Sequence, residues 1–144
     1  MGLAMDTTSV RRDTATDPAT REHAVVDAFV EATNERRFEA LVGLFADDAQ
    51  VNDQLRNFWG IAEIGRWLAD EIVGEQVELG VRGIRRHYDA VIVTAEIRGD
   101  FEAPRVPQPM IFDLYFTVVD GRIVRLLVLL ARDDMPEPEI RRSA

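Results

Sequence analysis

The sequence predicts a single α+β domain in which helices come first and a mostly antiparallel sheet follows. Up to about residue 72, apart from a short strand, the apolar residues recur at helical spacing, and after Gly74 they alternate with polar residues, as in half-buried strands. The 144 residues are enough for one ordinary domain with one hydrophobic core. Because most strands come together at the end of the chain, the helices are expected to pack on one face of their sheet.

Three helices are expected. The first begins near Asp17-Pro18, a start signal that precedes apolar residues at helical spacing between Ala24 and Ala32. The second is short and runs from Arg37 to Phe45, and the third runs from about Ile61 to Ile72. Between the second and third helices, Ala49 to Gln54 predicts a short strand.

Four strands are expected after the helices. The first contains the alternating residues Val77, Leu79 and Val81 and ends before a turn at Tyr88-Asp89. The other three are expected at Val91–Phe101, Met110–Val119 and Arg122–Arg132, with a hairpin turn at Asp120-Gly121 joining the last two. Residues 1–19 and 133–144 show no periodicity and are expected to be disordered tails around one domain at 20–132.

Composition narrows the chemistry that the domain could perform. All 17 basic residues are Arg, so the chain has no Schiff-base lysine and no phosphate-binding lysine of the Walker type. It has no Cys, which excludes thiol nucleophiles, disulfides and thiolate metal sites. Ser9 and Ser143 both lie in the tails, which argues against a Ser–His–Asp hydrolase. Carboxylate, His, Tyr and Arg side chains acting on a small organic substrate remain.

Charge and hydropathy limit the partners. The 26 acidic residues give a net charge of −9, opposite to what nucleic acid or an anionic membrane surface attracts. The apolar run from Ile123 to Ala131 is too short to span a bilayer, and the N-terminus lacks the apolar core of a secretory signal. His23 and His87 are isolated and have no metal-ligand spacing. We therefore expect a cytoplasmic protein with no cofactor, no metal, and no nucleic-acid or membrane partner.

A motif runs from Phe29 to Asp53: a helix, a short break, and then F-x-A-L-x-x-L-F-A-D-D-A-x-V-x-D. A third helix follows Trp59-Gly60, and the hairpin VDGRIV comes late, at Val119 to Val124. Together these features resemble the nuclear transport factor 2-like superfamily, which includes ketosteroid isomerases, limonene epoxide hydrolases and SnoaL-type polyketide cyclases. The resemblance covers roughly residues 20–132. It implies a conical barrel in which three N-terminal helices pack on a curved, mostly antiparallel sheet around one deep apolar pocket, and it implies a homodimer.

Asp53 is the leading catalytic candidate. Val51 and Asp53 share one face of their strand, so a Val51 side chain in the core carries Asp53 inward. A carboxylate in an apolar cavity is suited to general acid–base work. By resemblance, the position matches the aspartate general base of ketosteroid isomerase. The alternative is that Asp53 caps a turn at the end of the strand.

Three further residues are weaker catalytic candidates. Asp113 matches the second oxyanion donor of the isomerase by resemblance, but its strand's alternation places it opposite the apolar face unless a bulge intervenes. Glu96 could lie on either sheet face, and His87 either donates at the mouth of the pocket or lies in an exposed turn. The isomerase has a tyrosine donor where this chain has Phe29, which cannot donate a hydrogen bond. This difference argues against steroid isomerisation by the usual residues. The Asp–Arg–Asp set of the epoxide hydrolases has no residue-by-residue match.

A large set of apolar and aromatic residues is expected to bind a hydrophobic substrate. These residues are Phe29, Trp59, Trp67, Tyr88, Phe112, Leu114, Phe116 and Leu126. The last strand is apolar on both faces, so its outer face is expected to meet a second subunit. The segment 99–109 is either a mobile connection or a lid over the pocket.

We therefore favour a cyclase that closes a ring in a hydrophobic polyketide-type intermediate. The pocket would fold the substrate, with possible acid–base help from Asp53. One alternative is an isomerase of the ketosteroid type that uses Asp53 as its base. The other is a module that binds a small ligand without catalysis.

Overall fold

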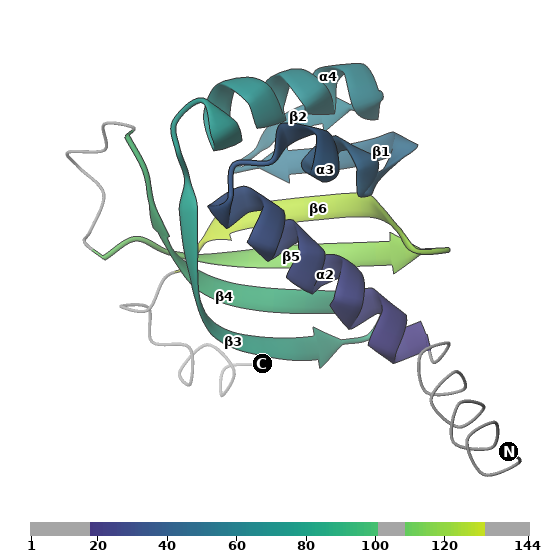
Figure 1. Cartoon of the computed structure of the whole chain (residues 1–144). Helices are drawn as coiled ribbons and strands as arrows, with labels where there is room; N and C mark the ends of the chain where they lie inside the picture. The colour runs from purple at the N-terminus through teal and green to yellow at the C-terminus, as the bar shows by residue number, and fades with distance from the viewer. Residues whose placement is uncertain (1–17, 101–108, 132–144) are drawn as a thin grey trace, which may run out of the picture.

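The computed structural model describes residues 18–100 and 109–131 and confirms the predicted α+β class (Figure 1). Its elements follow in the order α2 (Pro18–Asn34), α3 (Phe38–Gly43), β1 (Phe45–Asp53), β2 (Arg56–Trp59), α4 (Gly60–Trp67), the π-helical turn η1 (Leu68–Val73), β3 (Glu78–His87), β4 (Ala90–Arg98), β5 (Ile111–Val119) and β6 (Arg122–Leu130). The predicted lid falls mostly on residues 101–108, and the predicted tails fall almost entirely on residues 1–17 and 132–144. All of these lie outside the described residues.

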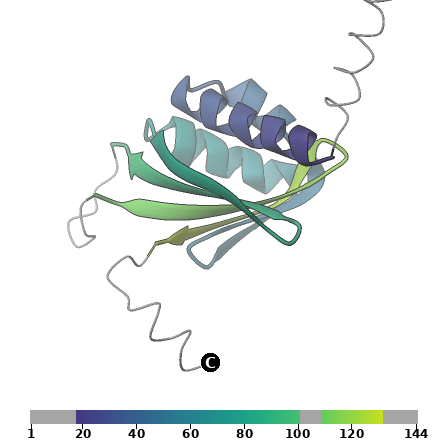
Figure 2. The same cartoon turned by 90° about the horizontal axis from the view of Figure 1, so that it is seen from below.

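The strands form one curved sheet in the order β2-β1-β6-β5-β4-β3. The β1–β6 pair is parallel, and every other neighbouring pair is antiparallel, as the sequence predicts. The helices lie together over one face of the sheet, which Figure 2 shows from below. The inner face of the sheet is therefore covered, and a space can form between it and the helices.

The core fills the region between α2 and the inner face of the sheet. Phe29 of α2 packs edge-on against Phe45 and Phe116, with ring centroids 6.2 and 5.1 Å apart, and all three rings are buried. Along β1 the inward residues Ala49 and Val51 are fully buried, so the next inward position is that of Asp53. The alternation that the sequence shows in this strand is the one that the structure has.

Several boundaries differ from the sequence prediction. β1 begins at Phe45 rather than Ala49, so the second helix ends earlier than expected. β2 was not expected at all, because the turn before it carries neither Gly nor Asn. α2 begins at Pro18, as the Asp17-Pro18 start signal predicts, and therefore includes the last two residues of the predicted N-terminal tail. None of the helices in residues 18–100 and 109–131 is both long and apolar enough to cross a membrane.

Candidate active site

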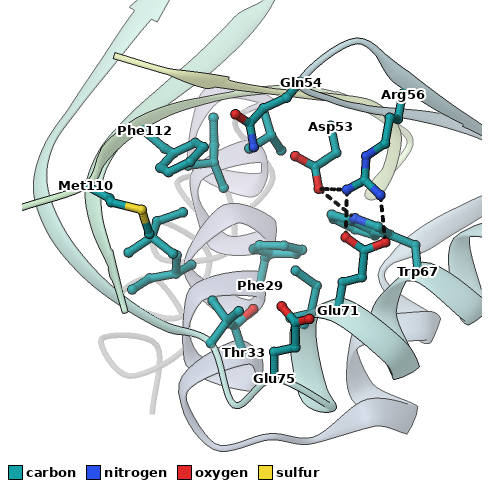
Figure 3. A pocket seen from close by; sticks show the side chains of 16 residues that line it. Phe29, Thr33, Asp53, Gln54, Arg56, Trp67, Glu71, Glu75, Met110 and Phe112 are labelled. Carbon is teal, nitrogen blue, oxygen red and sulfur yellow. Dashed lines mark hydrogen bonds and ion pairs between the residues drawn. The ribbon is translucent and has the colours of Figure 1, made fainter. Parts of the chain in front are cut away.

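A pocket of about 290 Å³ opens between α2, η1 and the inner face of the sheet (Figure 3). Its wall is mostly apolar, with polar groups contributed by the ends of the elements. The lining residues are Phe29, Thr33, Asp53, Gln54, Arg56, Trp67, Glu71, Ile72, Glu75, Val77, Leu79, Ile97, Met110, Phe112, Leu114 and Val128. An apolar cavity with a few convergent polar groups is typical of a small-molecule site.

Asp53 brings a carboxylate to this wall. It is the last residue of β1, and only 13% of its side-chain surface is exposed. Trp67 Nε1 donates a hydrogen bond to Asp53 Oδ2 at 3.0 Å, and Arg56 Nη2 donates to the same oxygen at 3.0 Å. Because both donors engage Oδ2, neither occupies Oδ1, and that oxygen is available to a molecule in the pocket.

Arg56 is fixed as a cation beside Asp53. Its Nη1 and Nη2 donate to the two carboxylate oxygens of Glu71 at 2.9 and 2.6 Å, a bidentate pair. Its guanidinium also lies 5.5 Å from the centre of the Phe58 ring. The hydrogen bond with Glu71 is the main cause that raises the pKa of Arg56 above its ordinary value, against a smaller lowering by burial. Arg56 is therefore a cation at neutral pH.

A tight hairpin turn places Asp53 opposite Arg56. The two residues pair across β1 and β2, with Gln54 and Leu55 forming the turn at φ values of 53° and 76°. Asn52 Oδ1 accepts the backbone N–H of Leu55 at 2.9 Å, and Gln54 N–H bonds the carbonyl of Val128 on β6 at 2.9 Å. Positive φ at both central residues is the type I′ conformation, which usually contains Asn-Gly.

A π-helical turn delivers the acidic side of the pocket. Gly74 N–H bonds the carbonyl of Ala69, five residues back, at 2.9 Å. A Cβ at Gly74 would lie 2.5 Å from the backbone oxygen of Asp70, so this closure requires glycine. Glu71 lies within the turn and Glu75 just after it, and both line the pocket.

Five of the predicted site residues line the pocket together. These are Asp53, Phe29, Trp67, Phe112 and Leu114. Phe116 and Leu126, predicted to contact the substrate, are fully buried in the core and do not line the cavity. Trp59 and Tyr88 were also expected there but are 59% and 85% exposed, because Trp59 ends the edge strand β2 and Tyr88 lies in the turn after β3.

Asp113, Glu96 and His87 are not brought to the pocket. Asp113 accepts a hydrogen bond from Thr94 Oγ1 at 2.6 Å, and Arg82 donates to Glu96 at 3.0 Å. The β4–β5 register continues without a bulge through Asp113, so this residue and Glu96 lie on the face away from the helices. His87 ends β3 as an exposed residue. The alternation of β5 had indicated this face for Asp113, and it is correct.

The sequence did not single out Thr33, Gln54, Arg56, Glu71 or Glu75. Asp53 and Arg56 are separated by two residues, a spacing that indicates a hairpin pair only once the turn is recognised. Glu71 is in the predicted third helix, but its position toward the pocket depends on the π turn. Within the described residues, no group of three or more His, Asp or Glu side chains is placed to hold a metal ion.

The comparisons with known proteins identify the family. Residues 26–126 match the model of the SnoaL-like domain. The chain belongs to this family. The match covers more than half of the chain and agrees with the superfamily that the Phe29–Asp53 motif predicts. Cyclases and isomerases both occur among SnoaL-like proteins. A comparison with the curated proteins finds no match.

Solved structures share the fold. A candidate polyketide cyclase from Sinorhizobium meliloti is 28% identical, with a TM-score of 0.65 over 73% of this chain and 93% of that one. A candidate ketosteroid isomerase from Kribbella flavida is 17% identical, with a TM-score of 0.65 over 81% and 82%. A protein of unknown function from Mesorhizobium loti is 12% identical, with a TM-score of 0.68 over 81% and 95%. The last two show the fold alone.

Proposed function

We propose that this protein is a cyclase that closes a ring in a small, hydrophobic, polyketide-type intermediate. The observation that carries the proposal is the Asp53 carboxylate, buried at the wall of an apolar pocket with Oδ2 held by Trp67 and Arg56 and Oδ1 left for a substrate. The SnoaL-like family and the 28% identical candidate polyketide cyclase support the same class of reaction.

The chemistry is an intramolecular aldol addition. Asp53 Oδ1 takes a proton from the carbon next to a carbonyl, and the resulting enolate carbon bonds to a second carbonyl carbon of the same molecule. The alkoxide that forms takes the proton back from Asp53, so no proton or electron is gained or lost overall. The pocket holds the two reacting carbons together, which replaces a large part of the entropic cost of ring closure.

Gln54 supplies the neutral donor that the reaction needs. Phe29 lines the pocket where the isomerases carry a tyrosine, and it has no hydrogen to donate. The side-chain amide of Gln54 lines the same pocket next to Asp53 and can donate to the enolate oxygen. The donor of this chain, Gln54, therefore lies at a different place in the pocket from the tyrosine of the isomerases. This difference is a reason to propose ring closure rather than steroid isomerisation.

The size of the pocket also favours a compact substrate. Ligand pockets commonly enclose about 300–1,000 Å³, so the 290 Å³ bounded by the described residues is just below that range. A molecule of one or two rings fits this volume better than a four-ring steroid. A short diketone that becomes a bicyclic ketol meets that limit.

Deuterium exchange tests the proton transfer without knowledge of the natural substrate. The wild-type protein is expected to accelerate incorporation of deuterium from D₂O at the α-carbon of 2-tetralone, followed by NMR. Asp53→Asn removes the base and should slow the exchange by about 10²–10⁴-fold, while 2-tetralone still binds. Equal rates in wild type and Asp53→Asn would contradict the proposal, and binding with no exchange in either protein would indicate a ligand-binding module.

A second assay separates ring closure from isomerisation. The wild-type protein is expected to accelerate closure of 2-(3-oxobutyl)cyclohexanone to its bicyclic ketol, followed by chromatography. An isomerase would instead convert 3-cyclohexenone to the conjugated ketone faster than it closes the diketone. That outcome would keep the role of Asp53 and replace the cyclase with the isomerase.

A further inference from the structure

The pocket has a second polar end that the proposed ring closure does not use. Thr33 is 1% exposed and lines the pocket, yet its hydroxyl is a buried side-chain atom with no hydrogen-bond partner among the described residues. A threonine within a helix commonly bonds the carbonyl one turn back, and Thr33 does not. Buried polar groups are almost always paired in folded proteins, so an unpaired one on a residue that lines a cavity indicates a missing ligand group.

The position of Thr33 within the pocket follows from α2. Phe29 and Thr33 are four residues apart and therefore lie on the same face of the helix, one turn from each other. In Figure 3, Phe29 lies between Thr33 and Glu75 on one side and Asp53 and Gln54 on the other. A ligand that crosses the Phe29 ring would therefore present one end to Asp53 and the other to Thr33.

Glu75 belongs to the same end of the pocket. The side-chain amide of Asn34, next to Thr33, donates to the carbonyl of Leu79 at 3.1 Å and accepts its N–H at 2.7 Å. This clamp fixes the start of β3 against the end of α2, and the segment from Glu75 to Leu79 lines the pocket there. The Glu75 carboxylate takes part in none of the ion pairs of the described residues.

The charges on the pocket wall decide what the Thr33 end can bind. The acidic side chains of the whole pocket are Asp53, Glu71 and Glu75, and its single cation among the described residues is Arg56. Arg56 is held by Asp53 and Glu71, so no positive charge of the described part of the lining faces Glu75. An ionised carboxyl group only accepts hydrogen bonds, whereas a threonine hydroxyl accepts or donates. The fitting group is therefore a donor and not an anion.

We propose that Thr33 and Glu75 form a second polar subsite that binds a hydrogen-bond-donating substituent of the substrate, a hydroxyl or a protonated amine. The substrate is then an apolar molecule with a carbonyl group at the Asp53 end and a donor at the Thr33 end. This inference rests on the proposed function only in taking the pocket as the substrate site. The subsite sets which substrate binds and in which direction, while Asp53 performs the proton transfer.

Calorimetric titration with three matched probes tests the subsite. 2-Naphthalenemethanol, 2-(aminomethyl)naphthalene and 2-methylnaphthalene share one apolar body and differ in the group offered to Thr33. The wild-type protein is expected to bind the alcohol and the amine more tightly than the hydrocarbon. Thr33→Val should weaken the alcohol about fivefold, the size of one neutral hydrogen bond, and leave the hydrocarbon within about twofold. Glu75→Gln should weaken the amine more than the alcohol, because it removes the negative charge.

Controls make the result decisive. Thr33→Ser keeps the hydroxyl and should keep the preference for the alcohol, and Thr94→Val makes the same change on the outer face and should alter no probe. Equal affinities of Thr33→Val and wild type for the alcohol would overturn the subsite, and so would an equal loss for all three probes. Asp53→Asn separates the two proposals, because it should slow deuterium exchange by about 10²–10⁴-fold, while the roughly fivefold effect of Thr33→Val on the alcohol should persist when both changes are combined. A wild-type protein that prefers the alcohol but exchanges no deuterium would contradict the proposed reaction alone.

Discussion

Asp53 and Asp113 are carboxylates on strands of the same sheet, yet the molecule gives them opposite surroundings. Asp53 ends β1 on the face covered by the helices, where Trp67 and Arg56 hold one of its oxygens at the pocket wall. Asp113 lies within β5 on the other face, where Thr94 donates to it. The sheet face, and not the residue type, decides which carboxylate meets a molecule in the pocket.

The largest expected difference between the two carboxylates is in proton transfer. Asp113→Asn should leave the deuterium exchange of 2-tetralone within about twofold of wild type, because the residue does not line the pocket. Asp53→Asn should lose about 10²–10⁴-fold, as expected for removal of a general base. The two variants are compared at equal protein concentration by NMR. A loss in Asp113→Asn as large as that in Asp53→Asn would remove the distinction between the faces.

The side chains that donate hydrogen bonds to the two carboxylates should differ in their contribution to the free energy of unfolding. Trp67→Phe removes the indole donor from the buried Asp53 and should lower the free energy of unfolding by about 1.5–3 kcal/mol, the usual cost of losing a hydrogen bond to a charged group. Thr94→Val removes the donor to the half-buried Asp113, which water can replace, and should change it by less than about 0.5 kcal/mol. Urea denaturation measures both. Equal losses would mean that burial does not distinguish the two carboxylates.

The π turn η1 holds Asp53 indirectly, because its residue Glu71 binds Arg56, which donates to Asp53. Gly74→Ala places a methyl group 2.5 Å from the Asp70 carbonyl, and the overpacking should lower the free energy of unfolding by about 1–3 kcal/mol. Because Glu71 holds Arg56 from this turn, the same variant should also slow deuterium exchange.

Gly65→Ala is the matched control for the π turn. Gly65 lies within α4 with nothing within 4 Å of its Cβ position, and alanine there should raise stability by about 0.5–1 kcal/mol. Thermal unfolding compares the two variants. A Gly74→Ala protein as stable as wild type would show that the turn relaxes without glycine, so that this support of Arg56 is not rigid.

The sequence predicts on which face of the sheet each of these two carboxylates lies. Strand alternation alone assigns Asp53 inward and Asp113 outward, because the period of two is regular from Ala49 to Asp53 in β1 and through Asp113 in β5. The hairpin of β5 and β6 is also readable, since Asp120-Gly121 supplies the positive φ values of 53° and 77° with a residue pair suited to them. The homodimer expected from the apolar last strand stays a prediction.

The positions of Gln54, Arg56 and Glu71 beside Asp53 were beyond prediction for a local reason. Gln54 and Leu55 adopt nearly the same positive φ values as Asp120 and Gly121, but neither residue type favours them. Without a turn signal there was no reason to expect β2, and without β2 no reason to place Arg56 opposite Asp53. Glu71 required the π turn in addition, which interrupts a pattern that reads as one regular helix.

The smallest expected effect concerns the turn that joins Asp53 to Arg56. Leu55 is 83% exposed at φ 76°, so its side chain loses little when removed while its backbone carries the cost of a left-handed conformation. That cost is about 1–2 kcal/mol, and glycine gives back roughly 0.5–1 kcal/mol through its freer unfolded chain. Leu55→Gly should therefore stabilise the protein by about 0.5–1 kcal/mol in thermal unfolding, whereas Gly121→Ala should destabilise it by a similar amount.

Deuterium exchange by Leu55→Gly tests whether the left-handed backbone at Leu55 contributes to proton transfer. Glycine accepts the same φ, so Asp53 and Arg56 stay paired and the exchange rate should remain within about twofold of wild type. A more stable but slower variant would mean that Leu55 holds the two side chains in register by resisting motion of the turn. A less stable variant would mean that the Asn52 and Val128 hydrogen bonds already compensate for the strain, so that the pocket turn is no more strained than the Asp120-Gly121 turn of the β5–β6 hairpin.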